Sequence, residues 1–391
     1  MAKKTVFITG GTGNMGWAAV QEMLKHPSDI NIKMLARKSP KNEEKLKDLM
    51  AKPNVKVVWG DLNNYDSILE GVTGSDYVLH VGGMVSPTAD WKPYRTQTTN
   101  IGAAQSICKA VLAQPNPDAV KVCYIGTVAE TGDRMPPIHW GRVGDPIKPS
   151  MFDYYAVSKV AAERYVIESG LKYWVSLRQT GIIGPAMSKI RDAIMFHNCY
   201  DNVLEYVSDR DSGVLLRNLS YQDATDTMDM AFWGHIYNIG GGEKCRVSTA
   251  EMFERLYGDI GIKDLSLILK PKMQATRNFH GHYYLDSDKL ENFVHFQRDS
   301  MEYYYDCYIK DLGATAPMAK VMCKVPGGEK LMATVMGMGF VFGLDTVGVS
   351  AWIMKVVSPL MSGLSPHVFV LVVIIFITVM TDFVSNTLSA S

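Results

Sequence analysis

The residues best suited to chemistry in this sequence are a tyrosine and a lysine four positions apart, Tyr155 and Lys159. On a helix, residues i and i+4 share one face, so the lysine ammonium would lie beside the phenol and favour its ionised form. A tyrosine pKa of roughly 10, lowered in this way, would allow proton exchange with a substrate hydroxyl or carbonyl near neutral pH. The spacing alone is common, so the surrounding sequence decides its meaning.

A glycine-rich turn near the start of the chain is the second candidate site. It follows the apolar run 5–9 and precedes a helical stretch. Its residues are Gly10, Gly11, Thr12, Gly13, Asn14, Met15 and Gly16. Without side chains, a phosphate can approach the backbone amides and the helix N-terminus more closely than a Cβ would allow. The turn therefore predicts nucleotide binding, with a plain glycine turn as the alternative.

The end of the second β-branched run indicates which dinucleotide would bind. The run 30–36 is followed by Arg37 and Lys38, and no acidic residue stands there. A carboxylate at this place would accept the ribose 2′-hydroxyl, whereas a basic side chain tolerates a 2′-phosphate. The sequence therefore favours NADP(H) over NAD(H), unless the basic residues form only a solvated loop. Asp61, after the third run, could meet the adenine edge.

Short β-branched runs alternate with helical stretches along the first 170 residues. This alternation predicts right-handed βαβ units and a doubly wound parallel sheet, an α/β fold of the Rossmann type. The expected strands are 5–9, 30–36, 55–59, 77–81 and 120–125, and the expected helices are 15–25, 41–50, 65–71, 98–112 and 154–169. We expect the glycine turn and the tyrosine–lysine pair to converge on one bound pyridine ring.

Composition sets the end of the chain apart from the rest. A hydrophobic helical tail, residues 331–391, carries only three charged side chains. If helical, the 22 residues from Leu360 to Thr381 would span about 33 Å, close to the hydrocarbon thickness of a bilayer. The tail therefore predicts membrane association, with a buried hairpin as the alternative.

Charge and cysteine usage exclude several classes of partner. The 40 basic and 40 acidic side chains cancel, so no general attraction to nucleic acid is expected. The six cysteines form no C-x-x-C pair and no regular spacing, so neither a metal site nor a disulfide framework is expected. His280 and His282 lack a third ligand at recognisable spacing. With no secretory signal at the start, we expect a cytoplasmic protein, attached to the cytoplasmic membrane face if the tail inserts.

These features together resemble the extended short-chain dehydrogenases/reductases of the NAD(P)-dependent epimerase/dehydratase superfamily, over residues 1 to about 325. The resembling segments are 9–16, 60–62, 80–83, 99–102, 125–132, 155–159, 178–185, 221–223 and 237–242. The resemblance implies that Tyr155 is the general acid/base, Lys159 its partner and a ribose ligand, and Thr127 a hydrogen-bond donor to the substrate oxygen. The further cofactor neighbours that it implies are Leu62, Val81, Gly82, Gly83 and Asn100. The resemblance also implies a homodimer, a dinucleotide-binding domain over residues 1–185 and a small substrate-binding part over 186–325, whose late strands and helices return to the core.

Two departures from the family pattern indicate the reaction. Related sugar-nucleotide dehydratases carry an Asp-Glu pair directly after the site threonine, where this chain has Val128 and Ala129. Sugar-nucleotide enzymes usually have an asparagine facing the substrate phosphates, where Gly181 stands here. We therefore expect an NADP(H)-dependent oxidoreductase that transfers a hydride between nicotinamide and a carbonyl or secondary alcohol of a small substrate. The alternatives are a sugar-nucleotide epimerase and a non-catalytic, membrane-tethered dinucleotide-binding protein.

The tail has a resemblance of its own. Segments 337–352 and 381–387 resemble a fragment of a divalent-anion/sodium symporter, a family in which a Ser-Asn-Thr turn helps to bind carboxylate and sodium. The remaining helices and the inverted repeat of such a transporter are missing. We therefore expect no transport by this chain alone, and a membrane anchor or a fusion are the alternatives.

Overall fold

The computed structural model describes residues 3–134, 136–189, 196–269, 273–275 and 280–334. The chain divides into two units. The first unit comprises residues 1–184, 201–249 and 278–304, and the second comprises residues 185–200, 250–277 and 305–391. The domain boundary expected near residue 185 and the role of each part stay predictions.

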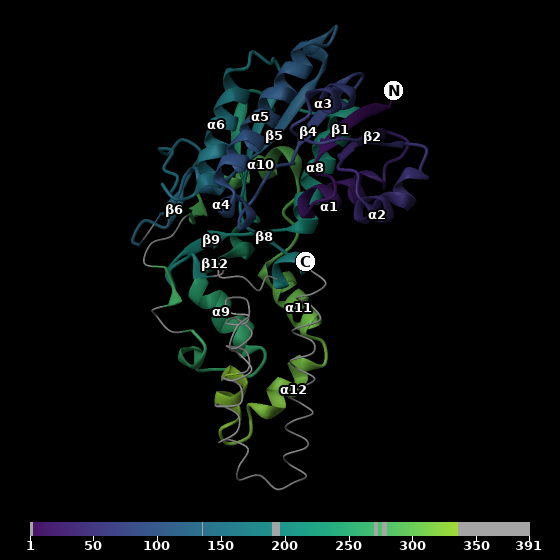
Figure 1. The fold of residues 1–391 in the computed structure, drawn as a ribbon. Coiled ribbons are helices and arrows are strands. Elements are labelled where there is room, and N and C mark those ends of the chain that lie inside the picture. The colour runs from purple at the N-terminus through teal and green to yellow at the C-terminus, as the bar shows by residue number, and fades with distance from the viewer. Residues whose placement is uncertain (1–2, 135, 190–195, 270–272, 276–279, 335–391) are drawn as a thin grey trace. The chain divides into compact units, whose positions relative to one another are not determined.

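The β-branched runs of the first unit form one seven-stranded parallel sheet (Figure 1). Its strands are β1 (Lys4–Thr9), β2 (Ile30–Ala36), β3 (Val55–Trp59), β4 (Tyr77–His80), β5 (Lys121–Thr127), β7 (Trp174–Gln179) and β11 (His235–Ile239). They lie in the order β3-β2-β1-β4-β5-β7-β11, which confirms the predicted α/β class. The chain order reverses between β1 and β4, and ligands of such sheets bind at the carboxyl ends of the strands beside that point.

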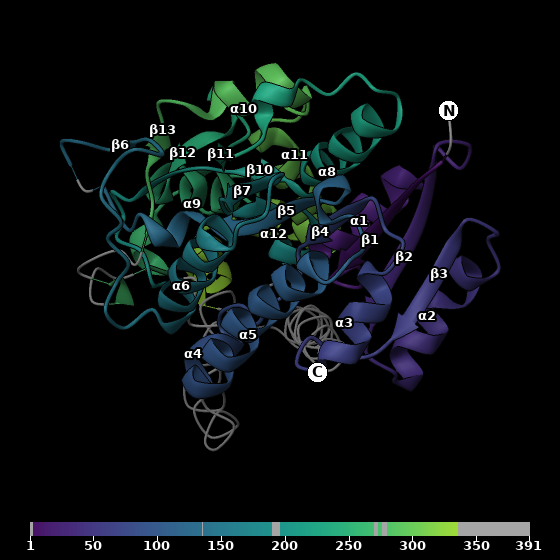
Figure 2. The same ribbon diagram turned by 90° about the horizontal axis from the view of Figure 1, so that it is seen from above.

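Helices cover both faces of this sheet (Figure 2). One face packs against α1 (Asn14–Met23), α2 (Pro40–Met50), α8 (Asp209–Ala224) and α10 (Ser287–Val294). The other face packs against α3 (Tyr65–Val72), α5 (Pro93–Leu112) and α6 (Tyr154–Glu168). In the middle of β1, Val6 and Ile8 point to the first layer and Phe7 to the second, so this part of the strand is apolar on both faces. Burial on both faces explains why these strands read as continuous hydrophobic runs.

Smaller elements complete the described part of the chain. Three two-stranded sheets of the first unit are β6 (Trp140–Gly141) with β13 (Tyr283–Tyr284), β8 (Ile182–Ile183) with β10 (Val207–Ser208), and β9 (Val203–Glu205) with β12 (Arg246–Ser248). The remaining helices are α4 (Thr88–Trp91), α7 (Pro185–Ser188), α9 (Thr249–Gly258), α11 (Met301–Leu312) and α12 (Thr315–Met322). The 3-10 turns are η1 (Pro117–Ala119), η2 (Val128–Glu130), η4 (Met230–Phe232), η5 (Glu243–Cys245) and η6 (Leu265–Leu267).

The second unit is held together by bonds between distant parts of its own sequence. The backbone amides of Lys263 and Asp264 both donate to Glu329 Oε1, at 2.7 and 2.8 Å. The Tyr200 hydroxyl donates to the carbonyl of Leu269 at 3.2 Å. These bonds tie the segment around residue 265 to the residues that follow α12 and to the segment near residue 200.

The predicted hydrophobic tail lies almost wholly outside the described residues, which end at residue 334. Among the residues that are described, no helix combines the length and the apolar character needed to cross a bilayer. Both symporter-like segments, 337–352 and 381–387, also lie beyond residue 334. Membrane association through 331–391 therefore stays a prediction.

Candidate active site

The glycine turn leaves its backbone bare because neighbouring backbone fills the space that side chains would need. Gly10 has φ +71°, in the left-handed region, and its carbonyl accepts a hydrogen bond from Gly13 N at 2.9 Å. A Cβ on Gly16 would lie 2.3 Å from the Gly10 oxygen. A Cβ on Gly10 would lie 2.7 Å from the backbone of Gly82. Glycine is therefore required at both ends of the turn.

A buried hydrogen-bonded chain joins the ends of β1 and β4. Gly82 N donates to Thr9 Oγ1 at 3.0 Å, and the same hydroxyl is 2.8 Å from His80 Nδ1. Burial, with a smaller effect from the Lys159 charge, lowers the pKa of His80 to about 3. His80 is therefore neutral and holds the two strand ends together at the switch point of the sheet.

Asn100 fixes the loop after β4 to the helix that carries the tyrosine. Its Oδ1 accepts from Met84 N at 2.7 Å, and its Nδ2 donates to Met84 O at 3.0 Å and to Ser158 Oγ at 2.9 Å. These bonds use its amide fully inside the protein. Asn100 thus lies behind the loop formed by residues 82–84, where it steadies that loop.

The expected catalytic residues come from the end of β5 and the start of α6. Thr127 ends β5, and its Oγ1 accepts from Ala129 N at 3.3 Å. Lys159 is buried, donates its ammonium to the carbonyl of Ile125, and has its Nζ 4.4 Å from the ring centroid of Tyr124. Tyr155 lies one turn before Lys159 on the same face of α6.

The pKa of Tyr155 moves opposite to the direction that the pairing with Lys159 predicts. Burial raises it well above its usual value, and this effect outweighs the hydrogen bond with Thr127 that lowers it. Asp153, the N-cap of α6, accepts from Ala156 N at 2.8 Å. Burial raises the pKa of Asp153 to about 6. The phenol is therefore protonated at neutral pH, which suits it to donate a proton to a carbonyl oxygen.

Beneath these residues lies a group of buried charges that sequence reasoning missed. Arg178 Nη2 is 2.6 Å from Glu163 Oε1, and Arg178 Nε is 3.4 Å from Glu130 Oε2. Glu163 follows Lys159 by four residues on α6. A repeat of polar residues at positions 155, 159 and 163, on the helix face that meets the sheet, is the signal that could have found it. The partner Arg178 sits in β7, and only the fold brings it near.

The glycine turn and the Tyr155–Lys159 pair line the same cleft, which has a volume of about 870 Å³. The expected site residues that line it are Gly10, Thr12, Gly13, Asn14, Met15, Gly16, Arg37, Asp61, Leu62, Val81, Gly82, Gly83, Thr127, Tyr155 and Lys159. Gly11, Lys38 and Asn100 are not among the lining residues. A Cβ on Gly11 would lie 2.4 Å from Met34 Sδ, so that glycine serves the packing of the core.

The cleft also exposes polar residues for which the sequence suggested no role. Gln179 lies beside Thr127 in the register of β5 and β7, and it is 9% exposed. Its Nε2 donates to the carbonyl of Thr180, while its Oε1 has no hydrogen-bond partner. A buried acceptor without a partner costs stability unless a ligand or water satisfies it. Gln179 is therefore a candidate ligand contact next to Thr127.

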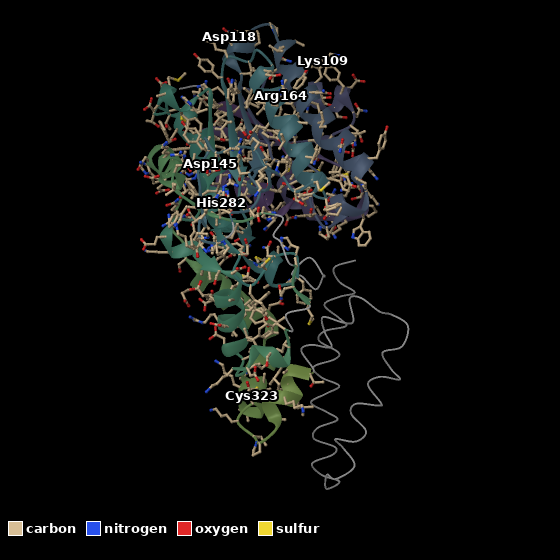
Figure 3. The ribbon with its side chains drawn as sticks, turned by 90° about the vertical axis from the view of Figure 1, so that its left-hand side faces the viewer. Lys109, Asp118, Asp145, Arg164, His282 and Cys323 are labelled. Carbon is tan, nitrogen blue, oxygen red and sulfur yellow. The ribbon has the colours of Figure 1, made fainter. Side chains whose placement is uncertain are left out.

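The described residues contain no group of three or more histidine, cysteine or acidic side chains that could hold a metal ion. His282, labelled in Figure 3, lies in the first unit with Asp145. Its Nε2 is 2.9 Å from Thr131 Oγ1, and burial lowers its pKa to about 4. His282 is thus a neutral residue of the protein interior, while His280 lines the cleft.

Comparison with known proteins identifies the family of this chain. The model of the NAD dependent epimerase/dehydratase family matches residues 6–219, which is more than half of the chain. The UDP-glucose 4-epimerase of Rickettsia akari is 32% identical over 127 residues, 32% of this chain and 36% of that protein. The enzyme of the same description from Rickettsia bellii is 34% identical over 110 residues, 27% of this chain and 32% of that protein. The matches span about a third of the length of these curated relatives.

Solved structures show the same fold at low sequence identity. The UDP-Glc/GlcNAc 4-epimerase of Campylobacter jejuni has a TM-score of 0.60 at 15% identity, covering 78% of this chain and 98% of that one. The UDP-glucuronic acid 4-epimerase of Bacillus cereus, in complex with NAD, has a TM-score of 0.55 at 18% identity, covering 79% and 99%. None of these similarities supports the symporter resemblance of the tail. The resemblance of the main part is confirmed: this chain belongs to the NAD dependent epimerase/dehydratase family, with the fold of the extended short-chain dehydrogenases/reductases.

Proposed function

We propose that this protein inverts a secondary alcohol on the sugar of a sugar nucleotide, with NAD as its resident cofactor. The observation that carries the proposal is the single cleft in which Thr127, Tyr155 and Lys159 face the glycine turn. The family match and the UDP-glucose 4-epimerase relatives favour an epimerase over the net oxidoreductase that the sequence alone favoured. The expected homodimer and the cytoplasmic location stay predictions.

The residues of the cleft fit a nicotinamide dinucleotide. The turn Gly10–Gly16 offers bare amides and the N-terminus of α1, the arrangement that accepts a diphosphate. Arg37 and Asp61 line the cleft after β2 and β3, where they would hold the adenosine end. Lys159 would hold the nicotinamide ribose, and the free Oε1 of Gln179 offers an acceptor beside it. A nicotinamide bound there would supply a reversible hydride acceptor for the substrate carbon.

The side chains at the end of β5 and the start of α6 would move the proton. With its phenol ionised, Tyr155 would take the proton of the substrate hydroxyl when that carbon is oxidised, and it would give the same proton back when the ketone is reduced. Thr127, which lines the cleft and hydrogen-bonds Tyr155, would donate a hydrogen bond to the same substrate oxygen. The Lys159 ammonium would stabilise the phenolate of Tyr155, which exists before the first step and is restored after the second. If the ketone presents its other face before reduction, the alcohol is inverted with no net redox change.

A second candidate function is supported by two specific residues. Arg37 lines the cleft after β2 without an acidic neighbour at residue 36 or 38, which favours NADP(H). Gly181 lines the cleft where sugar-nucleotide enzymes usually place an asparagine. Both residues fit an NADP(H)-dependent reductase of a carbonyl compound, the reaction that the sequence alone favoured.

One experiment separates the two candidates. The purified full chain is incubated with NAD and a panel of UDP- and dTDP-hexoses, and the sugar configuration is followed by proton NMR. We expect inversion at one carbon without net consumption of the cofactor, and its loss in Tyr155→Phe. Stoichiometric oxidation of NADPH with a carbonyl substrate, and no inversion of any sugar nucleotide, would establish the reductase instead.

A further inference from the structure

Four buried charged residues, which we call the charge cluster, lie beneath the catalytic end of the cleft. They are Glu130 at the end of η2, Lys159 and Glu163 on α6, and Arg178 on β7. Their exposed fractions are 0%, 6%, 4% and 2%. While Lys159 and Arg178 are both charged, the cluster is neutral only when both acids are ionised. An unbalanced charge at such depth is costly, so the cluster favours the form in which all four are charged.

Glu163 is already committed to partners within this cluster and to the sheet. Its Oε1 accepts from Arg178 Nη2 at 2.6 Å, and its Oε2 accepts from Arg178 Nε at 3.1 Å. The same Oε2 accepts from Ser176 Oγ at 2.6 Å. Glu163 and Arg178 therefore form a two-bond ion pair that is complete without Lys159.

Glu130 has a carboxylate oxygen that accepts no hydrogen bond. Its Oε1 accepts from Thr127 N at 2.8 Å, whereas its Oε2 has no hydrogen-bond partner and only an ion-pair distance of 3.4 Å to Arg178 Nε. Gly126 makes room for the carboxylate, since a Cβ there would lie 2.8 Å from Glu130 Oε1. Glu130 thus reaches two of the expected catalytic groups, Thr127 by a bond and Lys159 by charge.

Lys159 needs a counter-charge because its surroundings oppose its ammonium. Burial lowers the pKa of Lys159, and the only groups that raise it are Glu130 and then Glu163. His80, facing it from β4, is neutral because burial lowers its pKa. Tyr155 on α6 is protonated, as burial raises its pKa. Arg178 on β7 adds a like charge.

The charges around Lys159 also depend on Tyr124 and on the ionisation of Glu130. The pKa of Tyr124, on β5, is raised by burial, so its phenol is also uncharged. Burial, and then Glu163, raise the pKa of Glu130 well above its usual value, although Arg178, Lys159 and the bond from Thr127 N lower it. The contacts of Glu130 act against protonation, because Oε1 accepts from Thr127 N and Oε2 lies 3.4 Å from Arg178 Nε. Glu163 is already paired with Arg178 through two bonds, so the carboxylate of Glu130 is the one left to balance the charge of Lys159.

We propose that Glu130 is a positioning residue that keeps Lys159 charged and holds the backbone of Thr127 from behind the sheet. Glu130 does not line the cleft, so it acts through these two residues and not on the substrate. The proposal rests on the proposed function in assigning Lys159 and Thr127 to the reaction. Glu130 directly follows Val128 and Ala129, but its proposed role differs from that of the Asp-Glu pair of the related dehydratases.

The test compares the pH dependence of dinucleotide binding in the wild type and in Glu130→Gln. The glutamine keeps an oxygen for Thr127 N but removes the charge. Affinity for NAD and NADP is measured by quenching of protein fluorescence between about pH 6 and pH 10, the range that brackets the relevant titration. We expect the alkaline loss of affinity to move to lower pH by about one unit or more in Glu130→Gln. The exposed Glu168→Gln, also on α6, is the control and should titrate like the wild type.

Glu130→Asp separates charge from shape. It keeps the carboxylate, so its alkaline limb should stay near that of the wild type even where its affinity is lower at every pH. A purely structural role predicts that both variants weaken binding evenly across the range. An unchanged limb in Glu130→Gln, or an equal shift in both variants, would overturn the proposal. A wild type that binds neither dinucleotide would instead refute the proposed function.

Thermal unfolding gives a readout that needs no cofactor. At neutral pH, Glu130→Gln leaves Lys159 and Arg178 facing one carboxylate, so its melting temperature should fall. The double variant Glu130→Gln/Lys159→Met removes the extra cation, so its melting temperature should be higher than that of Glu130→Gln. If Glu130→Gln alone does not fold, the double variant should still fold. If the second substitution lowers the melting temperature further, Glu130 does not balance Lys159 and the proposal is wrong.

Discussion

The two ends of the cleft are built in different ways. At the glycine end the surface is bare backbone, and the close contacts that require glycine join residues of one turn to Gly82. At the catalytic end, the Tyr155 phenol lies above four buried charges supplied by η2, α6 and β7, and the Lys159 ammonium is one of the four. The first end depends on the absence of side chains and the second on the balance of charges. Substitutions should therefore act through sterics at one end and through ionisation at the other.

The largest effect is expected at the catalytic end, from Tyr155→Phe. Removing the proton donor should lower turnover by about 100-fold to 10,000-fold. Dinucleotide affinity should stay near that of the wild type, since the glycine turn is untouched. The measurement is steady-state turnover together with a binding titration. Tyr165→Phe, on an exposed part of α6, is the matched control, and turnover retained in Tyr155→Phe would refute the assignment.

At the glycine end, Gly16→Ala should lose both cofactor binding and stability. Its Cβ would lie 2.3 Å from the Gly10 oxygen, so the turn must shift. We expect a loss of about 1 to 3 kcal/mol in the free energy of unfolding, as for other overpacked sites. Gly102→Ala is the control, because a Cβ there has nothing within 4 Å and α5 should gain from alanine. Denaturant unfolding measures the stability of each variant, and a titration measures its affinity for NAD. Equal stability and equal affinity of the two variants would contradict the account.

Acid should weaken the connection between β1 and β4. The pKa of His80 is lowered from 6.5 to about 3, so below pH 6.5 the unfolded chain takes up a proton that the folded chain does not. Stability therefore falls as pH drops, by about 2 kcal/mol at pH 5 for this one histidine. Unfolding curves at several pH values measure the slope, and His80→Gln should flatten it. His235→Gln, an exposed histidine, should leave the slope unchanged.

The smallest effect concerns the cofactor's adenosine end. If Arg37 meets a 2′-phosphate, Arg37→Gln should weaken NADP binding by about tenfold, the loss of one charge-assisted hydrogen bond. NAD binding should hardly change. Parallel thermal-shift titrations with both cofactors measure the ratio. If the wild type already prefers NAD and Arg37→Gln changes neither affinity, the NADP preference expected from the sequence is wrong.

The fold could be predicted from the sequence because its signals are local. The first five strands of the main sheet are largely apolar runs, and they were predicted within a few residues of their observed ends, whereas the more polar strands β7 and β11 were not predicted. The helix expected at 98–112 begins at Pro93, since proline is tolerated in the first turn of a helix. The strand order is fixed by the short right-handed crossovers of such sheets.

The charge cluster could not be predicted, because it depends on packing between distant segments. Glu130 and Arg178 are 48 positions apart in the sequence and meet only when β5 and β7 pair. The direction of the Tyr155 pKa was wrong for the same reason, since it depends on how deeply the fold buries the phenol. Gly11 and Lys38 were assigned to the cofactor by their neighbours in the sequence, yet neither lines the cleft.

The central claim is that the glycine turn and Tyr155 act on one dinucleotide, and a crystal structure of the full chain with NAD tests it most directly. The account predicts the diphosphate on the amides of residues 10–16 and the nicotinamide ring within contact of the Tyr155 side chain. A dinucleotide bound at the turn with its nicotinamide directed away from Tyr155, or bound elsewhere on the protein, would contradict it.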